Sequence, residues 1–438
     1  MPLEMQPCRR HSCRPVEWRR ICVRKVLAVL FVSALWHFPY VYAEASTNPD
    51  GSDVPLLLFS GFGTLGAVHS NDDRADFTRG FFQPNGAGYT HSWSTDVDSL
   101  IAGQVAATFT PELSAVVQVI SQQGYNNTYA PQVEWANIKY RITPDLSIRA
   151  GRTVLPTFFL SDTQNIGYTY AWVRPPVEVY RLLPVGTNDG LDVSYRLHAG
   201  DLANTIQANY GHKSTDLTNN GGTAEARGSW GLSDTAEYGA LTTRIAYQYT
   251  NLTLPPLDSF FNAFRQFGAQ GVAIADRYNS DHKPNRFFDI GASYDPGAWF
   301  MTAEWAYNQN NSFVGQSTAW DLGGGYRLAR FTPYLLFAGA KARPISDPGL
   351  NVSSLPPFLV GPAIGLNAAL NSILSTNPVQ TTDSIGVRWD FAKHFDCKLQ
   401  LDHIRLGAGS SGTFVNIQPG FRLGGTVDLF SAVVDFVW

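Results

Sequence analysis

The sequence has little charge and, beyond its first segment, almost no cysteine. Only 16% of its 438 residues are charged, compared with about 25% in soluble globular domains. Three of the four cysteines lie within the first 22 residues, and Cys397 is the fourth. A mature chain without that first segment can form neither an internal disulfide nor a cysteine-based metal site.

The first 43 residues have the order of a secretory signal. Seven Lys or Arg residues precede an apolar core at 26–36, and small residues follow it. The core is too short to span a bilayer, and basic, apolar, then small residues is the order of a cleaved signal peptide. We predict a signal peptide of residues 1–43, cleaved after Ala43 or Ala45, with a start at Met5 left open.

Long hydrophobic runs and an excess of positive charge are also missing from the mature segment, 44–438. No run of 18 apolar residues follows the leader, so a chain of this kind that sits in a membrane has to cross it as a closed β-barrel. The leader carries seven bases and two acids, which leaves 25 bases, 34 acids and a net charge of about −9. That balance argues against nucleic acid as a partner.

What the sequence does contain is a series of short segments with alternating apolar and polar residues. The clearest is 191–198, and tight-turn signals separate many of the others, including Thr-Pro-acid-Leu-Ser at Thr110 and again at Thr143. Alternation with short turns at one end and longer loops at the other is typical of transmembrane barrels. We therefore predict an all-β, antiparallel transmembrane β-barrel of about sixteen strands, with a short helix near 366–374 inside one loop.

One connection, at about 153–189, is unusually long for a barrel. It is rich in aromatic and proline residues, among them Phe158, Trp172, Pro175 and Pro176. Long loops without regular structure are rare in compact folds and tend to be functional. Our interpretation is that this segment folds inward as a constriction loop.

Candidate pore residues come from strand alternation and from this loop. Lys139 and Arg141 share the face opposite Ile138 and Tyr140, so we expect them to point into the lumen. A basic wall facing an acidic loop would create a transverse field that tunes ion selectivity. The alternative is that each charge is an ordinary solvated lumen residue or part of a salt bridge of the loop. The basic wall favours anions and the acidic total favours cations, so both preferences stay open. The full candidate set is Lys139, Arg141, Arg149, Arg152 (whose direction alternation leaves open), Asp162, Arg174, Glu178 and Arg181.

Catalytic signals are weak. The mature histidines show no metal-ligand spacing, and no Gly-x-Ser-x-Gly elbow occurs. Asp402-His403 is more typical of an ordinary strand pair than of part of a triad, and Gly323-Gly324-Gly325 indicates a small-residue patch in the wall. We predict no catalytic residues, no metal and no cofactor.

The chain ends in an alternating segment, 433–438, with aromatic Phe436 and Trp438. This ending resembles the assembly signal of Gram-negative outer-membrane proteins. Together, the leader, strand count, long third loop and ending resemble the 16-stranded porins over the whole mature chain, and the segment 172–180 is similar to a motif of a less studied group of porin-like proteins. The Pro-Glu-Phe-Gly-Gly signature of enterobacterial general porins is absent.

The resemblance implies a multi-pass channel in the outer membrane of a Gram-negative bacterium, used for passive diffusion of small hydrophilic solutes and ions. It also implies a homotrimer, contact with membrane lipid and lipopolysaccharide, and assembly by the barrel-assembly machinery through the last strand. The alternatives are a substrate-specific, anion-selective channel and a closed structural or adhesion barrel. A soluble secreted β-propeller is the competing fold.

Overall fold

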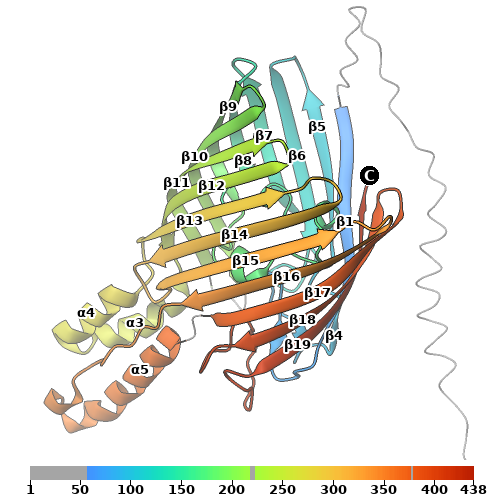
Figure 1. Cartoon of the computed structure of the whole chain (residues 1–438). Helices are drawn as coiled ribbons and strands as arrows, with labels where there is room; N and C mark the ends of the chain where they lie inside the picture. The colour runs from blue at the N-terminus through green and yellow to red at the C-terminus, as the bar shows by residue number, and fades with distance from the viewer. Residues whose placement is uncertain (1–56, 218–221, 376–377) are drawn as a thin grey trace, which may run out of the picture. The chain divides into compact units, whose positions relative to one another are not determined.

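Sixteen long antiparallel strands form a closed β-barrel in the computed structural model (Figure 1), which describes residues 57–217, 222–375 and 378–438. The predicted signal peptide lies outside the described residues. From β5 to β19 each strand pairs with the next along the chain, and β1 pairs with both β5 and β19, which closes the ring. The strands are β1 (Leu57–Ser70), β5 (Leu100–Thr108), β6 (Leu113–Gln122), β7 (Gln132–Arg141), β8 (Leu146–Val154), β9 (Thr187–Ala199), β10 (Leu202–Asp216), β11 (Thr223–Tyr238), β12 (Leu241–Thr253), β13 (Lys283–Tyr294), β14 (Trp299–Asn310), β15 (Gln316–Tyr326), β16 (Phe331–Ala342), β17 (Val379–Ala392), β18 (Phe395–Leu406) and β19 (Thr426–Val437).

This arrangement confirms the predicted fold class and strand number. Several strands run further than the apolar alternation indicated; β11, for example, continues to Tyr238. The extra residues are mainly polar and are paired by backbone hydrogen bonds, which do not depend on side-chain polarity. Three short strands, β2 (Asp76–Phe77), β3 (Ala87–Gly88) and β4 (Trp93–Ser94), lie in the first long loop.

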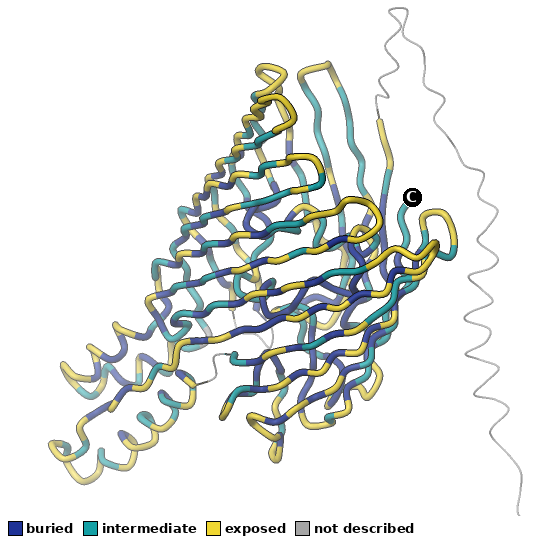
Figure 2. Tube along the Cα trace, viewed as in Figure 1, coloured by how far each residue is buried: buried dark blue, intermediate teal, exposed yellow. Residues whose placement is uncertain are grey.

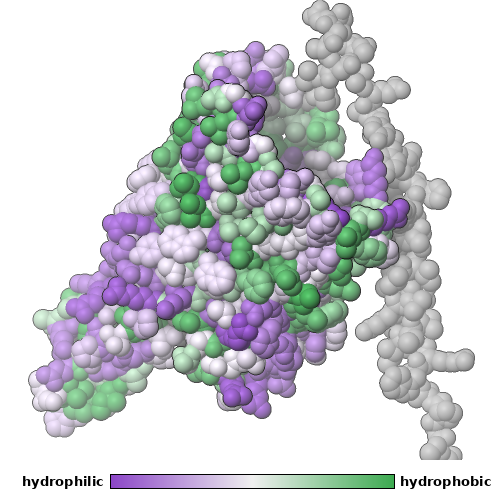
Figure 3. All heavy atoms as spheres, viewed as in Figure 1, coloured by the Kyte–Doolittle hydropathy of each residue, from purple (hydrophilic) through white to green (hydrophobic). Residues whose placement is uncertain are grey.

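The polarity of the barrel is inverted relative to a soluble protein. On β14, Trp305 and Met301 are exposed, whereas Glu304 and Asn308 on the opposite face are buried. Buried and exposed residues alternate along the strands in Figure 2, and apolar residues are spread over the outer face in Figure 3. An outward apolar surface and an inward polar one match a barrel whose outer solvent is lipid.

Three helices lie at the end of the barrel that carries the long loops: α3 (Asp258–Arg265), α4 (Gly268–Tyr278) and α5 (Pro357–Ser375). Their apolar faces meet in one cluster that contains Phe264, Ile274 and Leu370. The sequence predicted a loop where α3 and α4 form, because two helices of eight and eleven residues carry a weak periodic signal. The helix predicted at 366–374 does form, but it begins at Pro357, a residue type suited to a first helical turn. By length and apolar composition α5 could also cross a membrane.

The pairing between the first and last strands extends to the final residue. The backbone N–H of Trp438 donates to the carbonyl of Gly61 at 3.0 Å, and the Gly61 N–H donates back at 3.1 Å. A Cβ on Gly61 would overlap the Trp438 ring, so glycine is needed at this position. Phe436 stacks on Trp438 with ring centroids 5.9 Å apart and on Phe395 at 6.0 Å.

We therefore expect Trp438→Ser to lower the yield of folded barrel up to roughly tenfold, since it removes the ring that stacks on Phe436, and aromatic pairs contribute about 0.5–1.5 kcal/mol. Heat-modifiable migration on a gel measures the folded fraction. Phe331→Ser, which removes an exposed aromatic at another turn, is the matched control. Equal folded yields for the two variants would contradict a special role of Trp438.

Candidate functional site

The connection between β8 and β9 lies inside the barrel. It runs from Leu155 to Gly186 and includes η2 (Gly167–Thr169) and the single-turn helix α2 (Val177–Tyr180). Every residue in 170–179 is buried. Its partners are inward-facing side chains of the wall, contributed by β12, β14 and β17 to β19. We call the segment 155–186 the inner loop.

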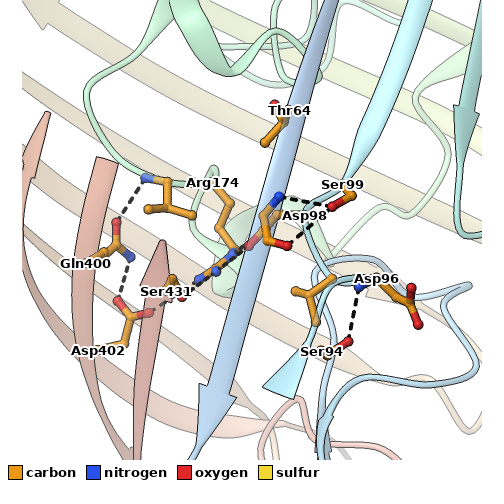
Figure 4. A network of polar contacts seen from close by, with 12 residues as sticks. Thr64, Ser94, Asp96, Asp98, Ser99, Arg174, Gln400, Asp402 and Ser431 are labelled. Atoms are coloured by element: carbon orange, nitrogen blue, oxygen red, sulfur yellow. Dashed lines mark hydrogen bonds and ion pairs between the residues drawn. The ribbon is translucent and has the colours of Figure 1, made fainter. Parts of the chain in front are cut away.

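Arg174 is the most extensively bonded residue of the inner loop (Figure 4). Its Nε and Nη2 donate to the two carboxylate oxygens of Asp98 at 2.8 and 2.7 Å, and Nη2 also donates to Ser431 Oγ at 2.7 Å. Nη1 donates to Asp402 Oδ2 at 3.3 Å. Burial disfavours the charged guanidinium, but the two carboxylates outweigh it, and the pKa of Arg174 is raised.

Glu178, one turn further on, binds the neighbouring part of the wall. Its Oε1 accepts from Gln380 Nε2 at 2.6 Å and from the Thr382 hydroxyl, both on β17. Burial raises the pKa of Glu178, while these two hydrogen bonds act in the opposite direction. Arg174 and Glu178 thus attach the buried segment 170–179 to neighbouring parts of the wall.

The start of the inner loop is held by β12 and β14. Glu304 accepts from the Phe159 N–H and from the Tyr180 hydroxyl, each at 2.8 Å. Arg244 donates to the Phe158 carbonyl at 2.9 Å and to Asp162 Oδ2 at 3.0 Å. The Asp162 side chain is 51% exposed, so this predicted loop acid reaches solvent.

The middle of the inner loop is held through its carbonyls. Lys398, which is fully buried, donates to the Gly167 carbonyl at 2.6 Å and forms an ion pair with Asp435 at 2.8 Å. Arg388 donates to the carbonyls of Tyr168 and Tyr170 at 2.7 and 3.1 Å. Cations from the wall therefore give these loop carbonyls charge-assisted hydrogen bonds.

Arg181 links the end of α2 to the loops at the rim. Its Nη1 donates to the carbonyls of Thr78 and Thr413 at 3.2 and 2.9 Å. Burial lowers the pKa of Arg181 to about 10. Of the predicted loop residues, Asp162 is therefore exposed to solvent. Arg174, Glu178 and Arg181 instead bond the inner loop to the wall or to the loops at the rim.

The predicted basic residues of the wall lie on β7 and β8. Lys139 is opposite Arg149 in register, and both alternate with outward apolar residues such as Ile138. Arg149 Nε pairs with Asp192 Oδ1 at 2.8 Å. Lys139 and Arg141 are exposed although they face inward, and they form no ion pair among the described residues.

Arg152, whose direction alternation left open, is part of a pair at the end of β8. Its Nε lies 2.6 Å from Asp189 Oδ1, and Asp189 is opposite it in register on β9. Both residues have the parity of the outward positions Ala150 and Leu191. Arg152 therefore lies on the outward face of β8. Lys139, Arg141 and Arg149 lie on the inward face, and we call these three residues the inward row.

Sequence reasoning missed the wall residues that hold the inner loop. Asp98, Gln400 and Glu304 supply hydrogen bonds to Arg174, Val173 and Phe159. Their inward parity was readable, since polar Lys398, Gln400 and Asp402 alternate with apolar residues. Alternation along a strand shows on which face a side chain lies, but it does not show which residue of the inner loop that side chain will bond. Asp98, Gln400 and Glu304 lie 76, 227 and 145 residues from their partners along the chain.

Two further sequence features are explained by the structure. Asp402 points inward to Arg174, whereas His403 lies on the other face and bonds Asp428 at 2.6 Å, so the two do not act together. At Gly323 a Cβ would lie 2.9 Å from the Trp172 ring. This part of the glycine patch makes room for the inner loop.

A closed antiparallel barrel with an apolar outer face, a polar interior and a loop folded inside has the architecture of a transmembrane β-barrel. No protein-family model matches the chain, and no characterised protein matches its sequence. Solved structures do match. They include OmpF of Salmonella typhi in complex with daunomycin (TM-score 0.52, 12% identity, 87% of this chain and 97% of that one) and the outer-membrane channel DcaP of Acinetobacter baumannii (0.52, 11%, 87% and 97%). An anion-selective porin from Comamonas acidovorans also matches (0.51, 10%, 87% and 99%). At these identities the match establishes the fold, which is that of bacterial outer-membrane porins.

Proposed function

We propose that this protein is a passive porin of the Gram-negative outer membrane, forming a water-filled channel for small hydrophilic solutes and ions. We further propose that it is a homotrimer without enzymatic activity, assembled by the barrel-assembly machinery through its last strand. The trimer and the assembly route rest on the resemblance given above. The channel rests on the fold and on the interior of the barrel.

The observation that carries the channel is the exposure of inward-facing charged residues. Lys139 and Arg141 face the interior, yet both are exposed and neither forms an ion pair among the described residues. Charged groups are seldom left unpaired away from water, so water has to reach this part of the interior. The inner loop is fixed to the wall by buried bonds, which supports its role as a fixed constriction rather than a mobile lid.

The proposed channel has a weak preference for anions. Around the inward row, the cations Lys139, Arg141, Arg149 and Arg196 outnumber the two acids paired with them, Asp192 and Glu237. On the inner loop the exposed acid Asp162 is paired with Arg244. The net charge of this part of the wall is thus positive, although the mature chain as a whole is acidic. Local charge governs ions close to the wall.

Single-channel recording in a planar bilayer tests this proposal. Folded protein is expected to insert with stable open steps in groups of three, and the reversal potential under a salt gradient is expected to have the sign of an anion-preferring pore. Saturation of the current by one solute would instead favour a substrate-specific channel. Absence of steps from protein shown to be folded by heat-modifiable migration would favour the closed structural barrel.

A further inference from the structure

A cavity of about 550 Å³ lies at the end of the barrel that carries the helices. Three segments line it: the end of α4, the turn between β14 and β15, and the residues that follow β16. Figure 3 shows hydrophilic residues gathered where β13 to β16 approach the helices. Small-molecule sites in proteins typically have volumes of about 300–1,000 Å³, so this cavity is large enough for a small ligand.

Backbone hydrogen bonds hold the three segments in place. The N–H of Arg343 donates to the Gln316 carbonyl at 2.8 Å, and the N–H of Phe313, in the turn, donates to the Tyr278 carbonyl at 3.0 Å. The Tyr278 hydroxyl also donates to Asp347 Oδ2 at 2.8 Å. Because each segment is bonded to a neighbouring one, the cavity is formed before a ligand arrives, which lowers the entropy cost of binding.

The charge of the cavity lining is positive. The described lining residues include two cations, Arg277 and Arg343, and no acid. Behind the lining, buried Asp347 accepts from Arg277 Nη1 at 3.0 Å. Arg343 is exposed and forms no ion pair among the described residues, and its Nη1 lies 3.4 Å from Gln316 Oε1. One guanidinium thus has no carboxylate partner, which matches a ligand with one carboxylate better than a dianion.

The same cavity has an apolar part, which consists of Pro344, Ile345 and the ring of Tyr278. Tyr278 is 7% exposed, and Ile345 packs against the apolar cluster of the helices. The Arg277 guanidinium lies 5.9 Å from the centroid of the Tyr278 ring. A planar ring packs well against such side chains, and guanidinium groups also stack on aromatic faces. The lining therefore suits a ligand that combines a ring with a single negative charge.

We propose that this cavity binds a small aromatic carboxylate, with the carboxylate on Arg343 and the ring against Pro344, Ile345 and Tyr278. A phosphorylated sugar fits less well, because its dianion exceeds the one unpaired guanidinium and its hydroxyls would meet the apolar side chains. The site lies apart from the inward row and from the inner loop. The inference therefore goes beyond the channel proposed above and does not require that the barrel conducts.

The test is a ligand-observed NMR titration of purified, folded protein in detergent with benzoate, compared with protein-free micelles. Wild type is expected to bind benzoate, and R343Q to bind it at least about tenfold more weakly, because a charge-assisted contact is lost. S346W keeps both arginines but fills the cavity, and it is expected to cause a similar loss. The matched control R330Q removes an exposed arginine in the short turn after β15 and is expected to bind as wild type does.

Two further probes test the class of ligand. Acetate, which lacks the ring, and benzyl alcohol, which lacks the charge, are each expected to bind at least about tenfold more weakly than benzoate. Equal binding of benzoate and acetate, or displacement of benzoate by inorganic phosphate at comparable concentration, would overturn the assignment to an aromatic carboxylate. Absence of benzoate binding, or equal binding by R343Q and wild type, would overturn the site itself. Benzoate binding by folded protein that gives no channel steps would support the site and count against the porin function alone.

Discussion

Arg174→Met is expected to loosen the inner loop and to give larger, noisier single-channel currents than the wild type. The substitution leaves Asp98 and Asp402 buried without their cation. Breaking a buried ion pair by removing one partner costs about 3–5 kcal/mol, so the segment around Arg174 is expected to become more mobile even though the other attachments of the inner loop stay in place. Single-channel recording reports the current, and the temperature at which the folded band is lost on a gel reports the stability.

Two controls separate the loop from general damage. The triple variant R174M/D98N/D402N removes all three charges together and is expected to recover most of the lost stability, because no uncompensated charge stays buried. Arg196→Met breaks the ion pair with Glu237, in which both side chains are 51% exposed. This substitution is expected to lower the free energy of unfolding by at most about 1 kcal/mol. Wild-type current noise from folded R174M would show that this network does not hold the loop in place.

K139E/R141E is expected to convert the proposed weak anion preference into a preference for cations. Both residues are exposed on the inward face and have no partner acid among the described residues, so each charge acts directly on ions in solution. Reversing two such charges should change the anion-to-cation permeability ratio roughly tenfold at low salt. The reversal potential under a salt gradient measures the ratio. The change should shrink at 1 M salt, where the Debye length is about 3 Å.

The matched control is R330E/K393E, which changes the net charge equally at two exposed positions in short turns outside the inward row. Its reversal potential is expected to stay close to that of the wild type. If both double variants shift the potential by the same amount, the total charge of the barrel sets selectivity. In that case Lys139 and Arg141 would have no special role.

Much of the barrel was readable from local patterns. Side chains on a strand alternate with a period of two, so the apolar residues of 138–142 or 191–197 already identify the outward face, and the turn signals at Thr110 and Thr143 separate neighbouring strands. The sixteen strands and the inward direction of Lys139, Arg141 and Arg149 follow from that rule. The length and the aromatic and proline content of the inner loop also indicated a stiff segment that folds inward. Helices α3 and α4 were not predicted, because their stability comes from packing with α5 rather than from their own short sequences.

What only the tertiary structure decided is which residues meet. Arg174 joins Asp98 to Asp402 across 76 and 228 positions of sequence, and Glu304 on β14 accepts from the Phe159 N–H, 145 positions away. Alternation determines the face on which a side chain lies, since it depends on the backbone of one strand alone. Partners depend on how strands far apart in the sequence align when the barrel closes, and no local pattern carries that information.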